Sequence, residues 1–88
     1  MSLKAIHRIL DIIDKHFDDK KPIDFAEDPT LEHYKIPMRK IYLILENLLE
    51  EDMIQGIELV GNYDEFLIKQ DTPRLTFKGM IFLYGTTV

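Results

Sequence analysis

Apolar residues recur every three or four positions near the start of the chain, which is the spacing of one face of an α-helix. The residues of this stripe are Leu3, Ile6, Ile9, Leu10, Ile13 and Phe17. Ser2 can cap the helix at its N-terminus, and the pattern breaks before Pro22, which cannot continue a helix. The spacing predicts an amphipathic helix of about four turns.

Two prolines indicate where the next two helices begin. Asp28 followed by Pro29 is typical of an N-cap and a first helical residue, because proline lacks only a donor that would have no partner there. A short second helix is predicted to follow, and a third over residues 37–52. The apolar face of this third helix comprises Met38, Ile41, Tyr42, Ile44, Leu45, Leu48 and Leu49.

After Met53 the spacing of apolar residues changes to two, which is the period of a β-strand. Ile57 and Leu59 flank Glu58, and after the stretch GNYDE a second alternating run contains Phe66 and Ile68. Two such runs around a turn that contains Gly-Asn predict an antiparallel hairpin.

A threonine opens the last predicted helix. The hydroxyl of Thr76 can accept from a backbone N–H one turn further on. Gly79 falls in the first turn, where glycine costs about 1 kcal/mol relative to alanine, so its presence indicates a packing constraint. The following residues, MIFLY, are apolar in every direction around the helix.

Two stretches resemble known winged-helix proteins. KIPMRKIYLILENLLEEDMIQGI is similar to a segment of many winged-helix repressors, and LTFKG is similar to the LT.KG that commonly follows their wing. In length and element order the chain resembles the YjcQ-like proteins of Gram-positive bacteria and their phages. The resemblance implies an α+β fold with a three-helix core, a two-stranded β-hairpin wing and a C-terminal helix. At 88 residues, the chain is expected to form one domain over residues 1–88.

The resemblance also implies DNA binding, with helix 37–52 as the recognition helix in the major groove of double-stranded DNA. Arg39 and Lys40 would meet phosphates or guanine, while Asn47 suits adenine. Leu43 suits a thymine methyl group, and Lys35 in the preceding turn a flanking phosphate. The alternative is that these side chains only solvate a helix face.

The charge distribution argues against DNA as the partner. The net charge is −5, and none of the three segments 1–36, 37–55 and 56–88 has more basic than acidic residues. DNA affinity derives largely from the neutralisation of phosphates. Glu46 and Glu50 share the face of Arg39, and the turn of the hairpin carries Asp64 and Glu65.

A surplus of apolar residues favours a second interpretation, a module for protein interaction or dimerisation that does not bind DNA. Ile12, Tyr42, Leu49, Phe82 and Leu83 have no obvious place in a small monomeric core. We therefore expect a twofold homodimer through the first and last helices. The expected contact residues are Ile12, Met80, Phe82 and Leu83. The alternative is that these residues complete a dense monomeric core.

Catalytic chemistry finds little support in the residue types. The sequence has one serine, Ser2, and no cysteine, and its four glycines are too widely spaced for a phosphate loop. His7, His16 and His33 lack the spacing of metal ligands. We expect no enzymatic activity, cofactor, metal or small-molecule substrate. The apolar runs are too short to cross a bilayer and the start does not resemble a secretory leader, so a cytoplasmic location is expected.

Overall fold

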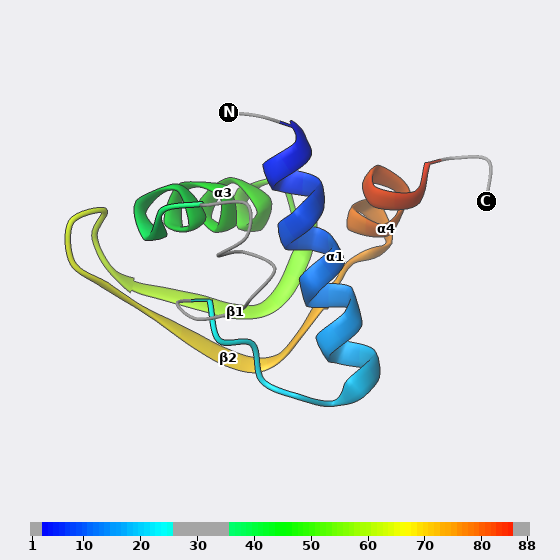
Figure 1. Ribbon diagram of the computed structural model, residues 1–88, viewed down its shortest axis with the longest axis horizontal. Helices are drawn as coiled ribbons and strands as arrows, with labels where there is room; N and C mark the ends of the chain where they lie inside the picture. Colours follow the sequence, from blue (N-terminus) through cyan, green and yellow to red (C-terminus); the bar gives the residue numbers. More distant parts are fainter. Residues whose placement is uncertain (1–2, 26–35, 86–88) are drawn as a thin grey trace.

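The computed structural model describes residues 3–25 and 36–85 and places in them three α-helices and one two-stranded antiparallel sheet (Figure 1). The elements in chain order are α1 (Leu3–Asp19), α3 (Met38–Glu50), β1 (Ile54–Gly61), β2 (Phe66–Leu75) and α4 (Phe77–Tyr84). This arrangement confirms the predicted α+β class. The predicted second helix, which would begin at Pro29, lies outside the described residues.

The helices pack around the twisted hairpin (Figure 1). α1 packs mainly against β2, α3 packs against β1, and α4 contacts both α1 and β2. Among the described residues, the largest fully buried side chains come from α1, α3 and β1, and they are Ile9, Leu10, Ile13, Ile41, Ile44, Leu45 and Ile54. The predicted apolar stripes of the first and third helices therefore form the core that joins the helices to the sheet.

The burial of three apolar residues differs from the burial that the sequence predicts. Phe17 belongs to the predicted stripe of the first helix, but it is 40% exposed because it lies in the last turn of α1, beside an open cleft. Ile23 and Phe25 are buried, although their short segment shows no periodic pattern. Ile23 is held because both of its backbone polar groups bond the side-chain amide of Gln70.

α1 and α3 each end at a residue with left-handed backbone conformation. Lys20 follows α1 with φ 55°, and Asp52 follows α3 with φ 56°. The N–H of Lys21 donates to the carbonyl of His16 at 3.0 Å, and that of Met53 donates to a carbonyl of the last turn of α3. These bonds close both helices in the manner usual for a glycine stop.

Glycine at either stop is expected to stabilise the chain. Lys20→Gly and Asp52→Gly should each raise the free energy of unfolding by about 0.5–1 kcal/mol, because glycine has no Cβ to strain the left-handed conformation. Urea unfolding followed by circular dichroism measures the change. Alanine at the same positions is the matched control and should give no gain, and a loss of stability on glycine substitution would contradict the assignment of the stops.

A bulge interrupts the hairpin near the helices. The register changes between Gln55 and Ile57, where residues 71–73 of β2 oppose the single residue Gly56. Gly56 has φ 81°, and a Cβ there would collide with backbone carbonyl groups of the opposing strand. Thr72 has φ 52°, which is an uncommon conformation for a β-branched residue. At the bulge, a glycine that cannot be replaced without a clash, Gly56, therefore lies opposite a threonine in a strained conformation, Thr72.

The LTFKG stretch fastens α4 to the end of α3. The Thr76 hydroxyl accepts from the N–H of Gly79 at 3.1 Å and donates to the carbonyl of Asp52 at 2.6 Å. The N–H of Thr76 donates to the carbonyl of Met53 at 2.9 Å. A Cβ on Gly79 would collide with that same carbonyl oxygen. This confirms both the predicted threonine cap and the predicted packing constraint at the glycine.

Candidate functional site

The outer face of α3 presents the side chains that a recognition helix would use. The opposite face carries the five buried residues of the helix, so Arg39, Lys40 and Asn47 lie exposed on the outside. Leu43 is half-buried on the same side. Lys35, the fifth predicted contact, lies outside the described residues. Pro37 is the N-cap and the helix ends at Glu50, so α3 is shorter than the predicted range 37–52.

The turn of the hairpin packs against the beginning of α3. The guanidinium of Arg39 lies 3.4 Å from the carboxylate of Asp64 and 5.4 Å from the ring centre of Tyr63. The Tyr63 ring in turn meets the ring of Tyr42 edge-on, with 6.3 Å between centroids. Arg39 is thus engaged within the chain, although an exposed ion pair is worth only about 0–1 kcal/mol.

The turn itself is fixed by Asn62. Its side-chain oxygen accepts from the backbone N–H groups of Asp64 and Glu65 at 3.0 and 3.1 Å. Gly61 has φ 109°, and a Cβ there would collide with the carbonyl of Glu65. These constraints hold the carboxylate of Asp64 beside α3. The sequence shows acidic residues in this turn, but the contact of Asp64 with Arg39 was not predicted from it.

Asn47 is also engaged. Its side-chain amide donates to the carbonyl of Leu43 one turn earlier, at 2.9 Å. An asparagine that reads adenine uses both its amide nitrogen and its oxygen on the base edge. Asn47 would have to give up the bond to Leu43 before it could do so.

The electrostatic character of this face is acidic. Two cations, Arg39 and Lys40, stand against four carboxylates on α3 and the hairpin turn, which are Glu46, Glu50, Asp64 and Glu65. Burial raises the pKa of Tyr42, and the nearby carboxylate of Glu46 raises it further. The face as a whole repels phosphate groups more than it attracts them.

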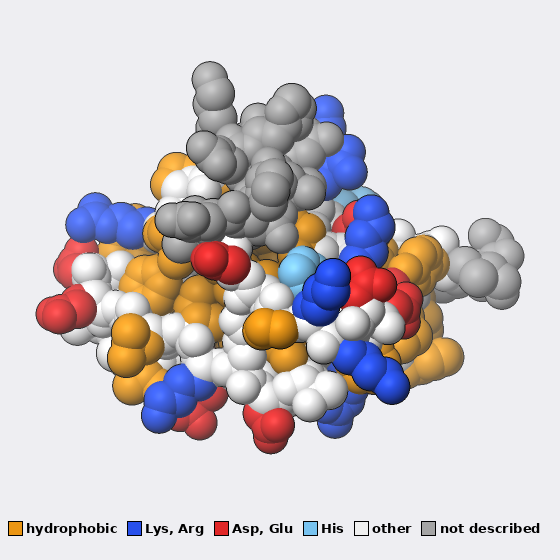
Figure 2. Space-filling model, turned by 60° about the horizontal axis from the view of Figure 1, so that its bottom comes forward, with side chains coloured by type: hydrophobic (Ala, Val, Ile, Leu, Met, Phe, Trp, Pro, Cys, Tyr) orange, Lys and Arg blue, Asp and Glu red, His pale blue; other side chains and the backbone are white. Residues whose placement is uncertain are grey.

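A second exposed face lies on α4. Phe77 is 79%, Met80 42% and Tyr84 52% exposed, and at helical spacing the three fall within about 60 degrees of arc. Figure 2 shows hydrophobic side chains gathered on the side of the molecule next to the C-terminus, where α4 lies. We call Phe77, Met80 and Tyr84 the α4 stripe.

The burial of Ile12 corrects one part of the predicted dimer contact. Ile12 does have a place in the monomer, since it is 5% exposed within the core. Phe82 and Leu83 are partly buried against the same core. Of the four predicted contact residues only Met80 is exposed, and the exposed Phe77 of the same helix was not among them.

Gly79 was the signal that could have oriented α4. A residue without a side chain marks the face that approaches other backbone, and Phe82 and Leu83 share the face of Gly79 at three- and four-residue spacing. Phe77 lies on the opposite face. The apolar run MIFLY does not show which face of α4 is buried, because apolar residues occur in every direction around the helix.

Acidic residues of α1 lie near the end of the α4 stripe. The hydroxyl of Tyr84 donates to the carboxylate of Asp14. That hydrogen bond, followed by partial burial and the charges of Asp14, Asp11 and Asp18, raises the pKa of Tyr84 from 10.0 to about 12. The tyrosine therefore keeps its proton to higher pH in the folded chain than in the unfolded chain.

The Tyr84 contact predicts a loss of stability in alkali. Between pH 10 and about 12 the unfolded chain releases the Tyr84 proton first, so the contribution is full below pH 10 and is lost as the pH rises toward 12. The urea midpoint measured across this range should fall less for Tyr84→Phe than for the wild type. Asp14→Asn should return the titration of Tyr84 toward 10. Equal declines in wild type and Tyr84→Phe would show that the hydrogen bond does not form.

Neither a metal cluster nor a membrane span is found in the described parts of the chain. Within residues 3–25 and 36–85, no three His, Asp or Glu side chains come together in a way that could hold a metal ion. None of the helices in these ranges combines the length and the apolar character that crossing a bilayer requires.

No protein-family model matches the chain, and comparisons with curated proteins and with solved structures likewise give no match. Function therefore has to be inferred from the surfaces of the chain itself.

Proposed function

We propose that the chain is a winged helix-turn-helix domain, similar to the YjcQ-like proteins, that acts as a non-catalytic interaction module and forms a homodimer through the α4 stripe. The observation that carries this proposal is the exposure of Phe77, Met80 and Tyr84 on one side of the last helix. Contiguous exposed apolar side chains of this size commonly mark a partner surface.

The arrangement of elements supports the winged-helix part of the proposal. α3 packs its apolar face on the core and turns a polar face outward, and a hairpin follows it directly. The hairpin turn lies beside the start of α3 through the contact of Arg39 with Asp64. The last helix follows the second strand after one capping residue, Thr76.

The energetic balance suits a dimer of moderate affinity. Two copies of the α4 stripe together contain six large apolar side chains. Complete burial is worth about 1.5–3 kcal/mol for such a side chain, whereas association costs about 4–15 kcal/mol. Because the stripe residues are already partly covered, the gain from burial is below its maximum of about 18 kcal/mol, and a surplus of about 8 kcal/mol over the association cost corresponds to a micromolar dissociation constant. We therefore expect a dimer at micromolar rather than nanomolar concentrations.

A second copy of this chain is the partner that the charges favour. Lys78, which also pairs with Glu51 of its own chain, lies in the first turn of α4, while Asp14 bonds Tyr84 at the other end and the charges of Asp11 and Asp18 act on the same tyrosine. In an antiparallel twofold pair of α4 helices, Lys78 of each copy approaches the acidic end of the other. The helix dipoles are also opposed in that arrangement, which is favourable.

Phe77→Ala tests the proposal. It should raise the dissociation constant of the dimer about tenfold or more, because Phe77 is the most exposed residue of the stripe. Sedimentation equilibrium at micromolar concentrations measures the constant. Leu67→Ala is the matched control, since Leu67 is 66% exposed on β2, and it should leave the constant unchanged. A wild-type chain that stays monomeric at these concentrations would refute the dimer.

DNA binding through α3 is the second candidate, and the outward position of Arg39, Lys40 and Asn47 favours it. If it is right, fluorescence anisotropy should detect binding to mixed-sequence duplex at low salt. The double variant Arg39→Ala/Lys40→Ala should then reduce the slope of log affinity against log salt by about one to two. If the interaction module is right, no binding to duplex is expected even at low salt.

A further inference from the structure

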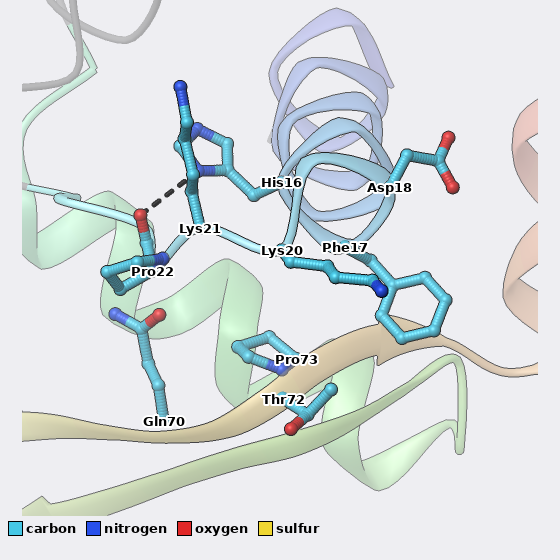
Figure 3. A pocket seen from close by; sticks show the side chains of 9 residues that line it. All are labelled: His16, Phe17, Asp18, Lys20, Lys21, Pro22, Gln70, Thr72 and Pro73. Atoms are coloured by element: carbon cyan, nitrogen blue, oxygen red, sulfur yellow. Dashed lines mark hydrogen bonds between the residues drawn. The ribbon is translucent and has the colours of Figure 1, made fainter.

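A cleft of about 600 Å³ opens between the last turn of α1 and the bulge of β2 (Figure 3). This volume is within the range of small-molecule sites in proteins. Its lining residues are His16, Phe17, Asp18, Lys20, Lys21, Pro22, Gln70, Thr72 and Pro73. The cleft is separate from both the outer face of α3 and the α4 stripe.

Hydrogen bonds hold the walls of the cleft in place. The Nδ1 of His16 donates to the carbonyl of Pro22, with 3.0 Å between the atoms. The amide of Gln70 accepts from the N–H of Ile23 at 2.9 Å and also donates to its carbonyl. The chain after α1 is thereby tied to β2 across the floor of the cleft. A ligand would meet a site that is already formed.

Backbone strain marks both sides of the cleft. Lys20 and Thr72 line it, and both have positive φ without being glycine. The conformation of Lys20 is explained by the helix stop. Thr72 has no such explanation, because it is β-branched and precedes Pro73, and both features disfavour a positive φ. Strain of this kind tends to collect at ligand sites.

The walls are apolar and the charged rim is mainly positive. Phe17, Pro22 and Pro73 offer flat apolar surface. In Figure 3 the side chain of Lys20 extends along the cleft in the direction of Phe17, whereas the carboxylate of Asp18 points away. Neither Lys20 nor Lys21 forms an ion pair with another residue that the structure describes.

From this geometry we propose that the cleft binds a small molecule with a flat apolar body and one anionic group. The apolar body packs between Phe17, Pro22 and Pro73, and the anionic group is held by Lys20, while Lys21, whose amine points away from that of Lys20 in Figure 3, adds positive charge at the rim. Aromatic carboxylates have this chemistry. The proposal does not depend on how the α4 stripe or α3 functions.

The test is an NMR titration of the full chain with 2-naphthoate and, separately, with its neutral counterpart 2-naphthalenemethanol. We expect 2-naphthoate to shift the backbone amides of residues 16–23 and 70–74. It should bind several times more tightly than the neutral alcohol. The double variant Lys20→Gln/Lys21→Gln should weaken 2-naphthoate binding about three- to tenfold, as expected for exposed ion pairs.

The matched control is Lys4→Gln/Lys69→Gln, which changes the net charge equally at exposed sites outside the cleft. This control should bind 2-naphthoate as the wild type does. Three outcomes would overturn the proposal. They are an absence of shifts at millimolar ligand, shifts confined to the α4 stripe, and equal binding of the alcohol and the carboxylate.

Discussion

Gly79→Ala is expected to lower the free energy of unfolding by about 3 kcal/mol. A Cβ at this position would collide with the carbonyl oxygen of Met53, which is backbone and cannot rotate away. That oxygen also accepts from the N–H of Thr76. α4 would therefore have to move, and the overpacking cost of about 1–3 kcal/mol would be joined by loss of a helix cap worth about 1 kcal/mol.

Urea unfolding followed by circular dichroism measures this effect. Lys78→Ala is the matched control in the same turn, since Lys78 forms only an exposed ion pair with Glu51 at 3.3 Å. Its removal should change stability by less than about 1 kcal/mol. If Gly79→Ala were as mild as the control, α4 would not be docked against Met53, and the outward orientation of the α4 stripe would lose its basis.

Gln70→Leu is expected to lower the free energy of unfolding by about 2–3 kcal/mol. Leucine can form neither of the two hydrogen bonds to Ile23, whose side chain is buried. The N–H and C=O of Ile23 would be left without these partners in a partly buried place, at about 1–3 kcal/mol for each unsatisfied group. Partial access of water to the cleft limits the total.

Gln70→Glu separates the two hydrogen bonds. At neutral pH its carboxylate can still accept from the N–H of Ile23, but it has no proton to donate to the Ile23 carbonyl. We expect its stability to lie between those of the wild type and Gln70→Leu. Lys69→Leu, on the neighbouring exposed position, is the control for an added apolar side chain on β2. A wild-type stability for Gln70→Leu would mean that the segment after α1 is held by other contacts.

The predicted elements that were confirmed depend on local patterns. The stripe of the first helix and the alternation in the hairpin are repeated over enough residues to specify which side faces inward. The cap at Thr76 and the constraint at Gly79 were also recognisable, because each reflects a local backbone requirement. The predicted burial of Phe17 was wrong. Periodicity shows which face of a helix is apolar, but it does not show how far along the helix the core extends.

The candidate sites were less predictable because they depend on contacts between distant residues. Arg39 and Asp64 are 25 positions apart, and nothing in either local pattern says that the turn folds back on α3. Gln70 and Ile23 are 47 positions apart, and the amide replaces contacts that a paired strand would make. Ile12 was misplaced for the same reason, since the size of the core became visible only when all its parts were assembled.

The sequence by itself determined the class of fold, because the spacing of apolar residues and the capping residues act over only a few positions. The same reading predicted the acidic character of the α3 face and the absence of cysteine chemistry. Only the tertiary structure decided which apolar residues remain outside, since the docking of Gly79 on Met53 turns Phe77, Met80 and Tyr84 outward. Burial depends on packing between segments that are far apart in the chain, and local sequence patterns do not predict that packing.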